Sequence, residues 1–491
     1  MSEDEFDLLV VGGGINGTGI ARDAAGRGLS VLLVEKDDLA AHTSSASSKL
    51  VHGGLRYLEQ FEFKLVRESL AERERLLRAA PHVVRPLEFV LPIGASSRPA
   101  WMIRAGLFLY DHLAGRTILP GARAVALDRD PRGLRPGPRK GFAYWDCRVQ
   151  DSRLVVLNAV DAAERGATIL TRTELIAARR ENSFWRASVR GPQGERTVRA
   201  RALVNAAGPW AQRLLERVDG ARQSRRVRLV KGSHMLLPKL YSGDHAFILQ
   251  NPDGRVVFAI PFEDRFTLVG TTDVEWTGDP GEPAIGEAET DYLLSTVARN
   301  FASSPSRGDI VWSYSGVRTL VDDGAGDPSK ATREYLIDLD TAGAPLLSVF
   351  GGKLTTYRSL AEKALDRLAP FLPRVSPGWT RDAWLPGGDI PDLDLERYAQ
   401  QLGKAWPALP SELLSRFARS YGTRTEALLA DVRTLEDLGE HFGGGLYARE
   451  VDYLVEKEWA RTAQDVLFRR TKLGLHISAE DSERLAAYMR G

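Results

Sequence analysis

Cysteine is almost absent from this chain. Cys147 is the one cysteine among 491 residues. A single thiol forms no internal disulfide and supplies no cysteine-rich metal site, so the sequence predicts a reducing compartment and a small buried role for Cys147. The histidines show no metal-ligand spacing, and we expect no metal.

An excess of charge of either sign is also absent. The chain has 66 Lys and Arg against 65 Asp and Glu, which gives a formal net charge of +1. This balance creates no global field that would attract nucleic acid, so no nucleic-acid partner is expected. An anionic ligand must instead be bound by a local cluster of Arg and Lys.

Long apolar runs and a signal peptide are missing too. The acidic start at residues 2–5 is unlike the basic start of a secretory signal. No run reaches the roughly 18 apolar residues of a membrane-spanning helix, and the richest stretch, 99–114, is interrupted by Arg104, Asp111 and His112. The sequence therefore predicts no transmembrane span and leaves attachment to a membrane surface open.

What is present begins with a dinucleotide-binding fingerprint. Residues 6–11 read as a buried strand, Gly12, Gly14 and Gly17 follow at GxGxxG spacing, and a helix runs to about residue 26. A second buried strand, 30–34, ends on Glu35, which is placed to accept hydrogen bonds from ribose hydroxyls. The free N–H groups at the start of the helix suit a pyrophosphate.

Three later segments favour FAD over NAD. Residues 43–49 are rich in hydroxyls that can bind phosphate and ribityl oxygens. Residues 203–210 form a strand that runs into a small-residue turn, as in the second nucleotide contact of two-dinucleotide-fold flavoproteins. Residues 350–356 place a Gly-Gly-Lys turn before a helix, whose N–H groups suit the flavin oxygen and nitrogen that gain negative charge on reduction.

The predicted fold class is α/β with α+β insertions. We expect a Rossmann-like FAD-binding fold, an antiparallel-sheet substrate domain that forms one wall of a cavity above the flavin, and an α-helical C-terminal domain. The FAD-binding domain is discontinuous, at 1–82, 150–217 and 316–384. The substrate-binding domain takes 83–149 and 218–315, and the helical domain takes 385–491.

Several longer motifs carry a family resemblance over almost the whole chain. The most specific are His-Gly-Gly-Leu-Arg-Tyr at 52–57 and Phe-Gly-Gly-Lys-Leu-Thr-Thr-Tyr at 350–357. Together with Lys-Gly-Ser-His at 231–234, Gly-Thr-Thr-Asp at 270–273 and Tyr-Ser-Gly-Val-Arg at 314–318, they resemble the aerobic, FAD-dependent glycerol-3-phosphate dehydrogenases.

That resemblance implies a reaction and its partners. It implies oxidation of sn-glycerol 3-phosphate to dihydroxyacetone phosphate by hydride transfer to FAD, with electrons passed to membrane quinone. It also implies a cytoplasmic enzyme, peripheral on the cytoplasmic face of the inner membrane, and suggests a homodimer. The related glycerophosphate oxidases carry an inserted segment for which this chain has no room, which favours the dehydrogenase.

The substrate requires cations for its phosphate and a base for its alcohol proton. Arg56, Arg318 and Lys353 lie in glycine-containing motifs, read as turns that bring their side chains close to the flavin, and Tyr57 adds a hydroxyl donor. Arg333 is a further candidate for the substrate oxygens.

The identity of the base stays open. His234 and Lys353 are the two candidates, because neutral imidazole accepts protons near pH 7 and cationic neighbours lower the pKa of a lysine. Asp273 is expected to orient His234 or a substrate hydroxyl. With Arg318, His234 and Lys353 form the expected catalytic set.

The expected FAD contacts come from all three nucleotide segments, and His52 is assigned to them rather than to catalysis. They are Gly12, Gly14, Ile15, Asn16, Gly17, Glu35, Thr43, Ser44, Ser45, Ser47, Ser48, Leu50, His52, Gly53, Gly54, Ala207, Gly208, Trp210, Gly352, Leu354 and Thr355.

Two other functions compete with the dehydrogenase. One is a flavin oxidase that acts on glycerol 3-phosphate or an amino acid and passes electrons to oxygen. The other is a flavin-holding membrane scaffold, for which the basic stretch 461–472 offers a contact to anionic lipid, although a solvated or inter-domain helix face explains those charges better.

Overall fold

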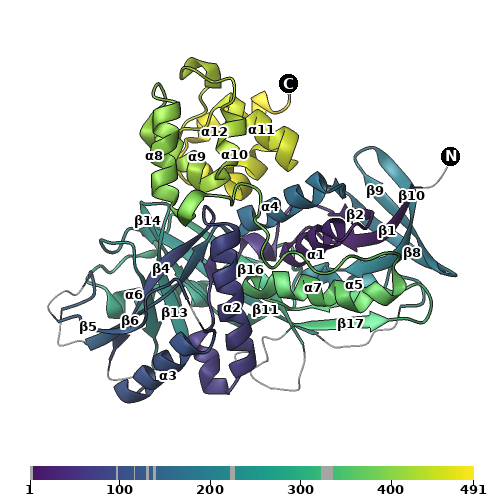
Figure 1. The fold of residues 1–491 in the computed structure, drawn as a ribbon. Coiled ribbons are helices and arrows are strands. Elements are labelled where there is room, and N and C mark those ends of the chain that lie inside the picture. The colour runs from purple at the N-terminus through teal and green to yellow at the C-terminus, as the bar shows by residue number, and fades with distance from the viewer. Residues whose placement is uncertain are drawn as a thin grey trace.

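The structure is a computed structural model that describes residues 4–94, 98–115, 117–128, 132–136, 140–221, 227–321 and 335–491. Two large sheets lie side by side and a helical domain packs above them (Figure 1). Arg333, predicted to bind substrate, lies outside the described residues.

The first sheet has eight strands and is parallel at its centre. Its order is β17-β18-β10-β1-β2-β7, and β8 and β9 extend it as an antiparallel ribbon beside β10. Its strands are β1 (Asp4–Val11), β2 (Val31–Val34), β7 (Thr168–Leu170), β8 (Glu174–Glu181), β9 (Phe184–Gly191), β10 (Gly194–Asn205), β17 (Leu336–Asp340) and β18 (Leu346–Phe350).

Alternation along β1 explains how this sheet is covered on both faces. Leu8 and Val10 pack with α1 (Ile15–Gly26), α4 (Asp151–Glu164) and α7 (Tyr357–Leu368), whereas Leu9 and Val11 pack with the β8–β9 ribbon and α5 (Ala211–Leu215). Because successive strand residues point to opposite faces, the short apolar run builds two cores at once. The predicted α/β class and Rossmann-like fold are confirmed.

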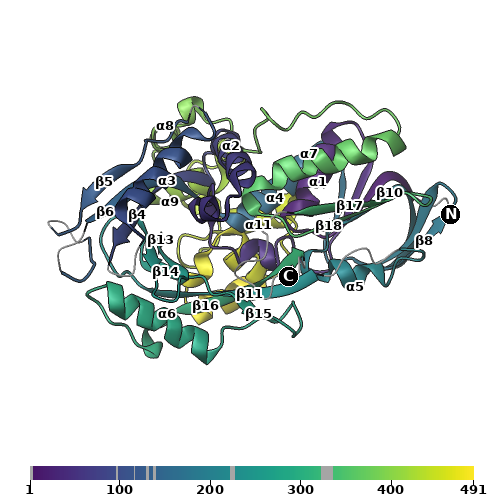
Figure 2. The same cartoon turned by 90° about the horizontal axis from the view of Figure 1, so that it is seen from below.

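The second sheet has ten strands, antiparallel except where β12 runs parallel to β4. Its strands are β3 (Leu50–Val51), β4 (Val84–Ile93), β5 (Arg123–Ala126), β6 (Lys140–Val149), β11 (Val227–Pro238), β12 (Ala246–Gln250), β13 (Val256–Phe262), β14 (Phe266–Gly270), β15 (Val274–Glu275) and β16 (Trp312–Val321). Helices α2 (Phe63–Ala79) and α3 (Ala100–His112) pack on one face, and α6 (Glu287–Asn300) lies on the other, as Figure 2 shows.

The pairing of two strands differs from the predicted domain edges. β16 pairs with β11 along its length, so the edge predicted at residue 316 falls inside a strand of the second sheet. β3 pairs with β6, although residues 50–51 were predicted within the FAD-binding domain. Sequence separation gives no sign of such pairings, because strand partners are set by the three-dimensional fold.

Residues 385–491 form a helical layer above both sheets (Figure 1). Its α-helices are α8 (Leu395–Ala405), α9 (Ser411–Tyr421), α10 (Arg424–Leu428), α11 (Ala448–Glu458) and α12 (Ala479–Tyr488). They enclose a core of their own around Phe417, Phe442 and Leu454. Cys147, on β6, is fully buried, as predicted.

Candidate functional site: a dinucleotide cavity with a cationic end

A cavity of about 640 Å³ lies between the two sheets. Its first wall comes from the glycine loop, the hydroxyl-rich segment after Glu35, and the turns that follow β10 and β18. Its second wall comes from the other sheet. The residues of that second wall include Leu91, Tyr144, Ile248, Gln250, Val256, Phe258, Val317, Arg318, Thr319 and Leu320.

The glycine loop is packed too closely to accept side chains. A Cβ on Gly12, whose φ is +117°, would lie 2.5 Å from the carbonyl oxygen of Ala206, and a Cβ on Gly17 would lie 1.9 Å from that of Gly12. The Ile15 N–H, at the start of α1, donates to Ser44 Oγ at 3.0 Å. The backbone at the positive end of α1 therefore reaches the cavity, as a pyrophosphate requires.

Glu35 lines the cavity at the end of β2. Its carboxylate accepts the N–H of Gly13 at 2.6 Å and that of Asp37 at 2.8 Å, while burial raises its pKa. These two bonds fix the carboxylate, and each oxygen keeps a lone pair for a ribose hydroxyl. The glycine backbone leaves space for a dinucleotide, and the Glu35 carboxylate lies beside that space. The site therefore fits FAD.

The third nucleotide segment meets the first at Asn16. Gly351 and Gly352 adopt left-handed conformations with φ of +75° and +108°, which only glycine adopts without strain. The Asn16 side-chain amide donates to the carbonyl oxygen of Gly351 at 3.1 Å. Segments 335 residues apart in the chain thus form one cradle.

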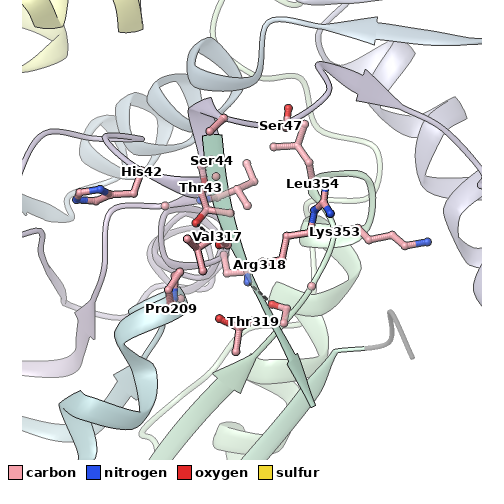
Figure 3. A pocket seen from close by; sticks show the side chains of 18 of the residues that line it. His42, Thr43, Ser44, Ser47, Pro209, Val317, Arg318, Thr319, Lys353 and Leu354 are labelled. Carbon is pink, nitrogen blue, oxygen red and sulfur yellow. Dashed lines mark hydrogen bonds between the residues drawn. The ribbon is translucent and has the colours of Figure 1, made fainter. Parts of the chain in front are cut away.

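Arg318 lies in the middle of β16 and not in a turn, which corrects the prediction. Its guanidinium donates to Asp273 and, at 3.1 Å, to Thr271 Oγ1. The side chain crosses Gly232 to reach them, since a Cβ there would lie 2.5 Å from its Nη2. Asp273 therefore orients Arg318 rather than His234. Figure 3 shows Arg318 and Thr319 on one strand, with Lys353 entering from a separate segment.

Two further cationic side chains line the cavity. Lys353 Nζ lies 3.8 Å from the centre of the Tyr57 ring, a cation–π contact. Arg56 is half-buried, and within the described parts of the chain its guanidinium makes no hydrogen bond or ion pair. Arg56, Arg318 and Lys353 thus share this end of the cavity, where the lining carboxylate of Asp273 pairs with Arg318 and that of Glu59 pairs with Arg98.

The two histidines of interest are placed differently. His52 lines the cavity, and burial, followed by the charges of Lys353 and Arg73, lowers its pKa to about 3. His234 is 1% exposed and does not line the cavity: its Nε2 is 2.9 Å from Ser48 Oγ and its ring stacks on Tyr314. His234 therefore supports the hydroxyl-rich segment from behind.

Most of the predicted site residues line this one cavity. They are Gly12, Gly14, Ile15, Asn16, Glu35, Thr43, Ser44, Ser47, Ser48, Leu50, His52, Gly54, Arg56, Tyr57, Ala207, Gly208, Trp210, Asp273, Arg318, Gly352, Lys353, Leu354 and Thr355. Gly17, Ser45, Gly53 and His234 do not line it.

The sequence reasoning missed the residues of the second wall. Ile248 and Gln250 on β12, like Val256 and Phe258 on β13, stand two positions apart and therefore share one face of the sheet. That alternation was a usable signal, but periodicity alone does not say which face looks into a cavity. His52 was assigned to the cofactor, and its position near Lys353 was not foreseen.

The fold and the cavity define an FAD-dependent oxidoreductase. Comparison with known families agrees: residues 7–358 match the family described as FAD dependent oxidoreductase, and residues 379–489 match the C-terminal domain of alpha-glycerophosphate oxidase. The chain belongs to the FAD-dependent oxidoreductases that carry this domain, the group of the aerobic glycerol-3-phosphate dehydrogenases. FAD is its cofactor.

Individual relatives span nearly the whole chain. A glycerol-3-phosphate dehydrogenase of Pseudomonas aeruginosa is 55% identical, covering 99% of this chain and 95% of its own. A D-erythritol 1-phosphate dehydrogenase of Brucella abortus is 54% identical, covering 99% and 98%. The solved glycerol-3-phosphate dehydrogenase of Bacillus halodurans, complexed with FAD, has a TM-score of 0.75 at 27% identity and covers 100% of this chain and 95% of its own.

Proposed function

We propose that this protein oxidises sn-glycerol 3-phosphate to dihydroxyacetone phosphate. The observation that carries the proposal is the cationic end of the dinucleotide cavity, formed by Arg56, Arg318 and Lys353. A phosphate dianion suits this end, because arginine forks bind two oxygens at once and Lys353 adds a point charge. FAD, which the glycine loop and Glu35 would hold, would supply the acceptor for the hydride from C2 of the substrate.

We propose His52 as the acceptor of the C2 hydroxyl proton, in place of the two bases considered from the sequence. Its imidazole faces the cavity and is neutral, because burial and nearby cations lower its pKa to about 3. A phosphate dianion on Lys353 removes part of that repulsion and raises the pKa of His52 when the substrate is bound. Lys353 then serves the phosphate, and His234 has no path to the substrate.

D-Erythritol 1-phosphate is the second candidate substrate. It is favoured by the relative of that name, which is 54% identical over nearly the full length of both chains. Both compounds present a secondary alcohol beside a phosphorylated carbon, so the same cations and the same base serve either. They differ in length, and we propose that the second wall, which includes Gln250 and Phe258, receives the extra carbon.

Anaerobic reduction of the bound flavin tests both candidates. We expect glycerol 3-phosphate to bleach the flavin absorbance and unphosphorylated glycerol to leave it unchanged. The ratio of kcat/KM for the two polyol phosphates identifies the preferred substrate. If neither compound bleaches the flavin, the proposed reaction is wrong and the scaffold hypothesis gains.

The proposal extends to membrane quinone as the electron acceptor, to a peripheral position on the cytoplasmic face of the inner membrane, and to a homodimer. Among the described residues, no helix is long and apolar enough to cross a membrane. The outer face of α3, however, exposes Trp101 by 70% and Phe108 by 66%, with Arg104 between them, and Phe61 nearby is 79% exposed.

This aromatic face with a basic residue suits the interface of a bilayer of anionic lipid. Vesicle sedimentation and activity with a soluble quinone against oxygen test it. Rapid peroxide formation in air without quinone would instead support the oxidase.

A further inference from the structure

The turn 52–54 joins β3 to the short helix η2 (Leu55–Gln60) and carries His52 directly before Arg56 and Tyr57. Neighbouring side chains pack closely against the backbone of this turn. A Cβ on Gly53 would lie 2.5 Å from Leu70 Cδ2 and 2.6 Å from Tyr110 Oη, and Gly54 has a left-handed φ of +82°. The position of the His52 ring therefore depends directly on what holds this backbone.

The buried hydroxyl of Tyr110 binds the backbone of this turn. The N–H of Gly53 donates to Tyr110 Oη at 2.8 Å, and the Tyr110 hydroxyl donates to Asp146 Oδ2 at 2.7 Å. The Gly53 N–H also donates directly to Asp146 Oδ1, at the longer distance of 3.4 Å. Burial raises the pKa of Tyr110 well above its usual value, so the hydroxyl keeps its proton and its role as donor.

Asp146 is fixed in turn from β6 and α2. Arg73 Nη1 donates to Asp146 Oδ1 at 2.8 Å and to the carbonyl oxygen of Trp145 at 3.0 Å, while its Nη2 lies 2.9 Å from Glu74 Oε1. Tyr110 and Asp146 are 2% and 1% exposed. A buried hydrogen-bonded network of this kind favours one geometry and resists deformation.

We propose that Tyr110 and Asp146 are positioning residues for the reaction: they fix the Gly53 peptide so that His52 and Arg56 meet the substrate. Neither lines the cavity, so both act through Gly53. On the opposite side, the His52 N–H donates to Thr355 Oγ1 at 3.3 Å, which leaves the turn clamped between the cofactor cradle and α3. The role in catalysis rests on the proposed function.

The test replaces Tyr110 with Phe in the FAD-loaded protein. The ring keeps its edge contact with Tyr144, at 5.7 Å between centres, and only the hydroxyl is lost. We expect the rate constant of anaerobic flavin reduction at saturating glycerol 3-phosphate to fall about 10-fold, because sub-ångström misplacement of reacting groups is costly. Flavin content and the substrate concentration at half-saturation should change less than 3-fold, roughly, since the cavity keeps its lining.

Tyr241→Phe is the matched control. Its buried hydroxyl donates to the carbonyl oxygen of His245 at 2.8 Å, in the connection between β11 and β12 and outside the cavity lining. We expect a similar loss of Tm in both variants, with the rate falling only in Tyr110→Phe. Equal rates for wild type and Tyr110→Phe, or an equal fall in both variants, would overturn the proposal.

Hydrogen exchange supplies a readout that does not depend on the substrate. Protection of the amides in a peptide covering 50–58 should fall in Tyr110→Phe and not in Tyr241→Phe. Unchanged protection would refute the clamp itself. If protection falls while wild type is not reduced by either polyol phosphate, the clamp stands and the proposed function fails.

Discussion

Arg56 offers the most direct test of where the phosphate binds. The guanidinium lines the cavity and, within the described residues, donates none of its five N–H groups to another protein group. Two charge-assisted hydrogen bonds to phosphate are worth about 1.5 kcal/mol each at the low end of the usual range. Arg56→Ala should therefore weaken substrate binding by about 3 kcal/mol, roughly 100-fold in KM.

The assay measures KM and kcat with glycerol 3-phosphate and, separately, inhibition by inorganic phosphate. The phosphate inhibition constant should rise with KM, because both report the same contact. Arg56→Lys keeps the charge and loses the fork, so we expect an intermediate rise of about 10-fold. Arg67→Ala, an exposed arginine on α2, is the control and should change neither constant.

One outcome refutes the reasoning. If Arg56→Ala lowers kcat while KM and the phosphate inhibition constant stay at wild-type values, Arg56 does not hold the phosphate in the ground state. Its charge would then act only in the transition state, and Arg318 with Lys353 would be the phosphate site.

Three further predictions concern the cofactor, the membrane and stability. Gly17→Ala should abolish FAD retention, measured by absorbance after gel filtration, because the new Cβ would lie 1.9 Å from the Gly12 oxygen. Trp101→Glu combined with Phe108→Glu should reduce sedimentation with anionic vesicles at least 10-fold, roughly, without changing activity on a soluble quinone. Burial lowers the pKa of Lys472 to about 7. The free-energy cost of burying its charged amine is therefore complete below pH 7 and decreases as the pH rises toward the pKa that the lysine has in the unfolded chain. Lys472→Met should raise Tm more at pH 6 than at pH 9.5.

The cofactor half of the site was largely predictable because its signal is local. Gly12, Gly14 and Glu35 belong to one strand-loop-helix-strand unit of about 30 residues, in which spacing along the chain fixes spacing in the structure. The same holds for the helical C-terminal domain, whose amphipathic periods depend on neighbours three and four residues apart.

The substrate half depends on strand pairing and was predicted less well. Arg318 on β16 pairs with Val230 on β11, while Val274, next to Asp273, pairs with Lys231 on the other edge of β11. The ion pair between Arg318 and Asp273 crosses that strand, and no spacing in the sequence indicates it. The position of His234 was unforeseen for the same reason, since the register of β11 places its ring against Ser48 and outside the cavity lining.

The structure shows what the basic stretch near residue 470 contacts, whereas composition left open whether it meets lipid or another part of the protein. Arg470 donates twice to Asp38, each time at 2.8 Å, and Arg469 donates to the same carboxylate at 2.6 Å. Asp38 is 2% exposed and lies three residues after Glu35. These arginines therefore bind the helical domain to the cofactor loop and have no charge to offer a lipid headgroup.

Two consequences follow from that buried contact. The proposed membrane contact therefore involves another surface, for which the exposed aromatic face of α3 is the candidate; the buried face of the same helix holds Gly53 through Tyr110. We expect the helical domain instead to stabilise the cofactor site. Breaking a buried ion pair on one side costs about 3–5 kcal/mol, so Asp38→Ala should loosen the segment that follows Glu35 and release FAD even though Asp38 does not touch the cavity. A loss of FAD in this variant, with the helical content unchanged by circular dichroism, would show that the domain stabilises the cofactor site; full FAD retention would show that it is an independent appendage.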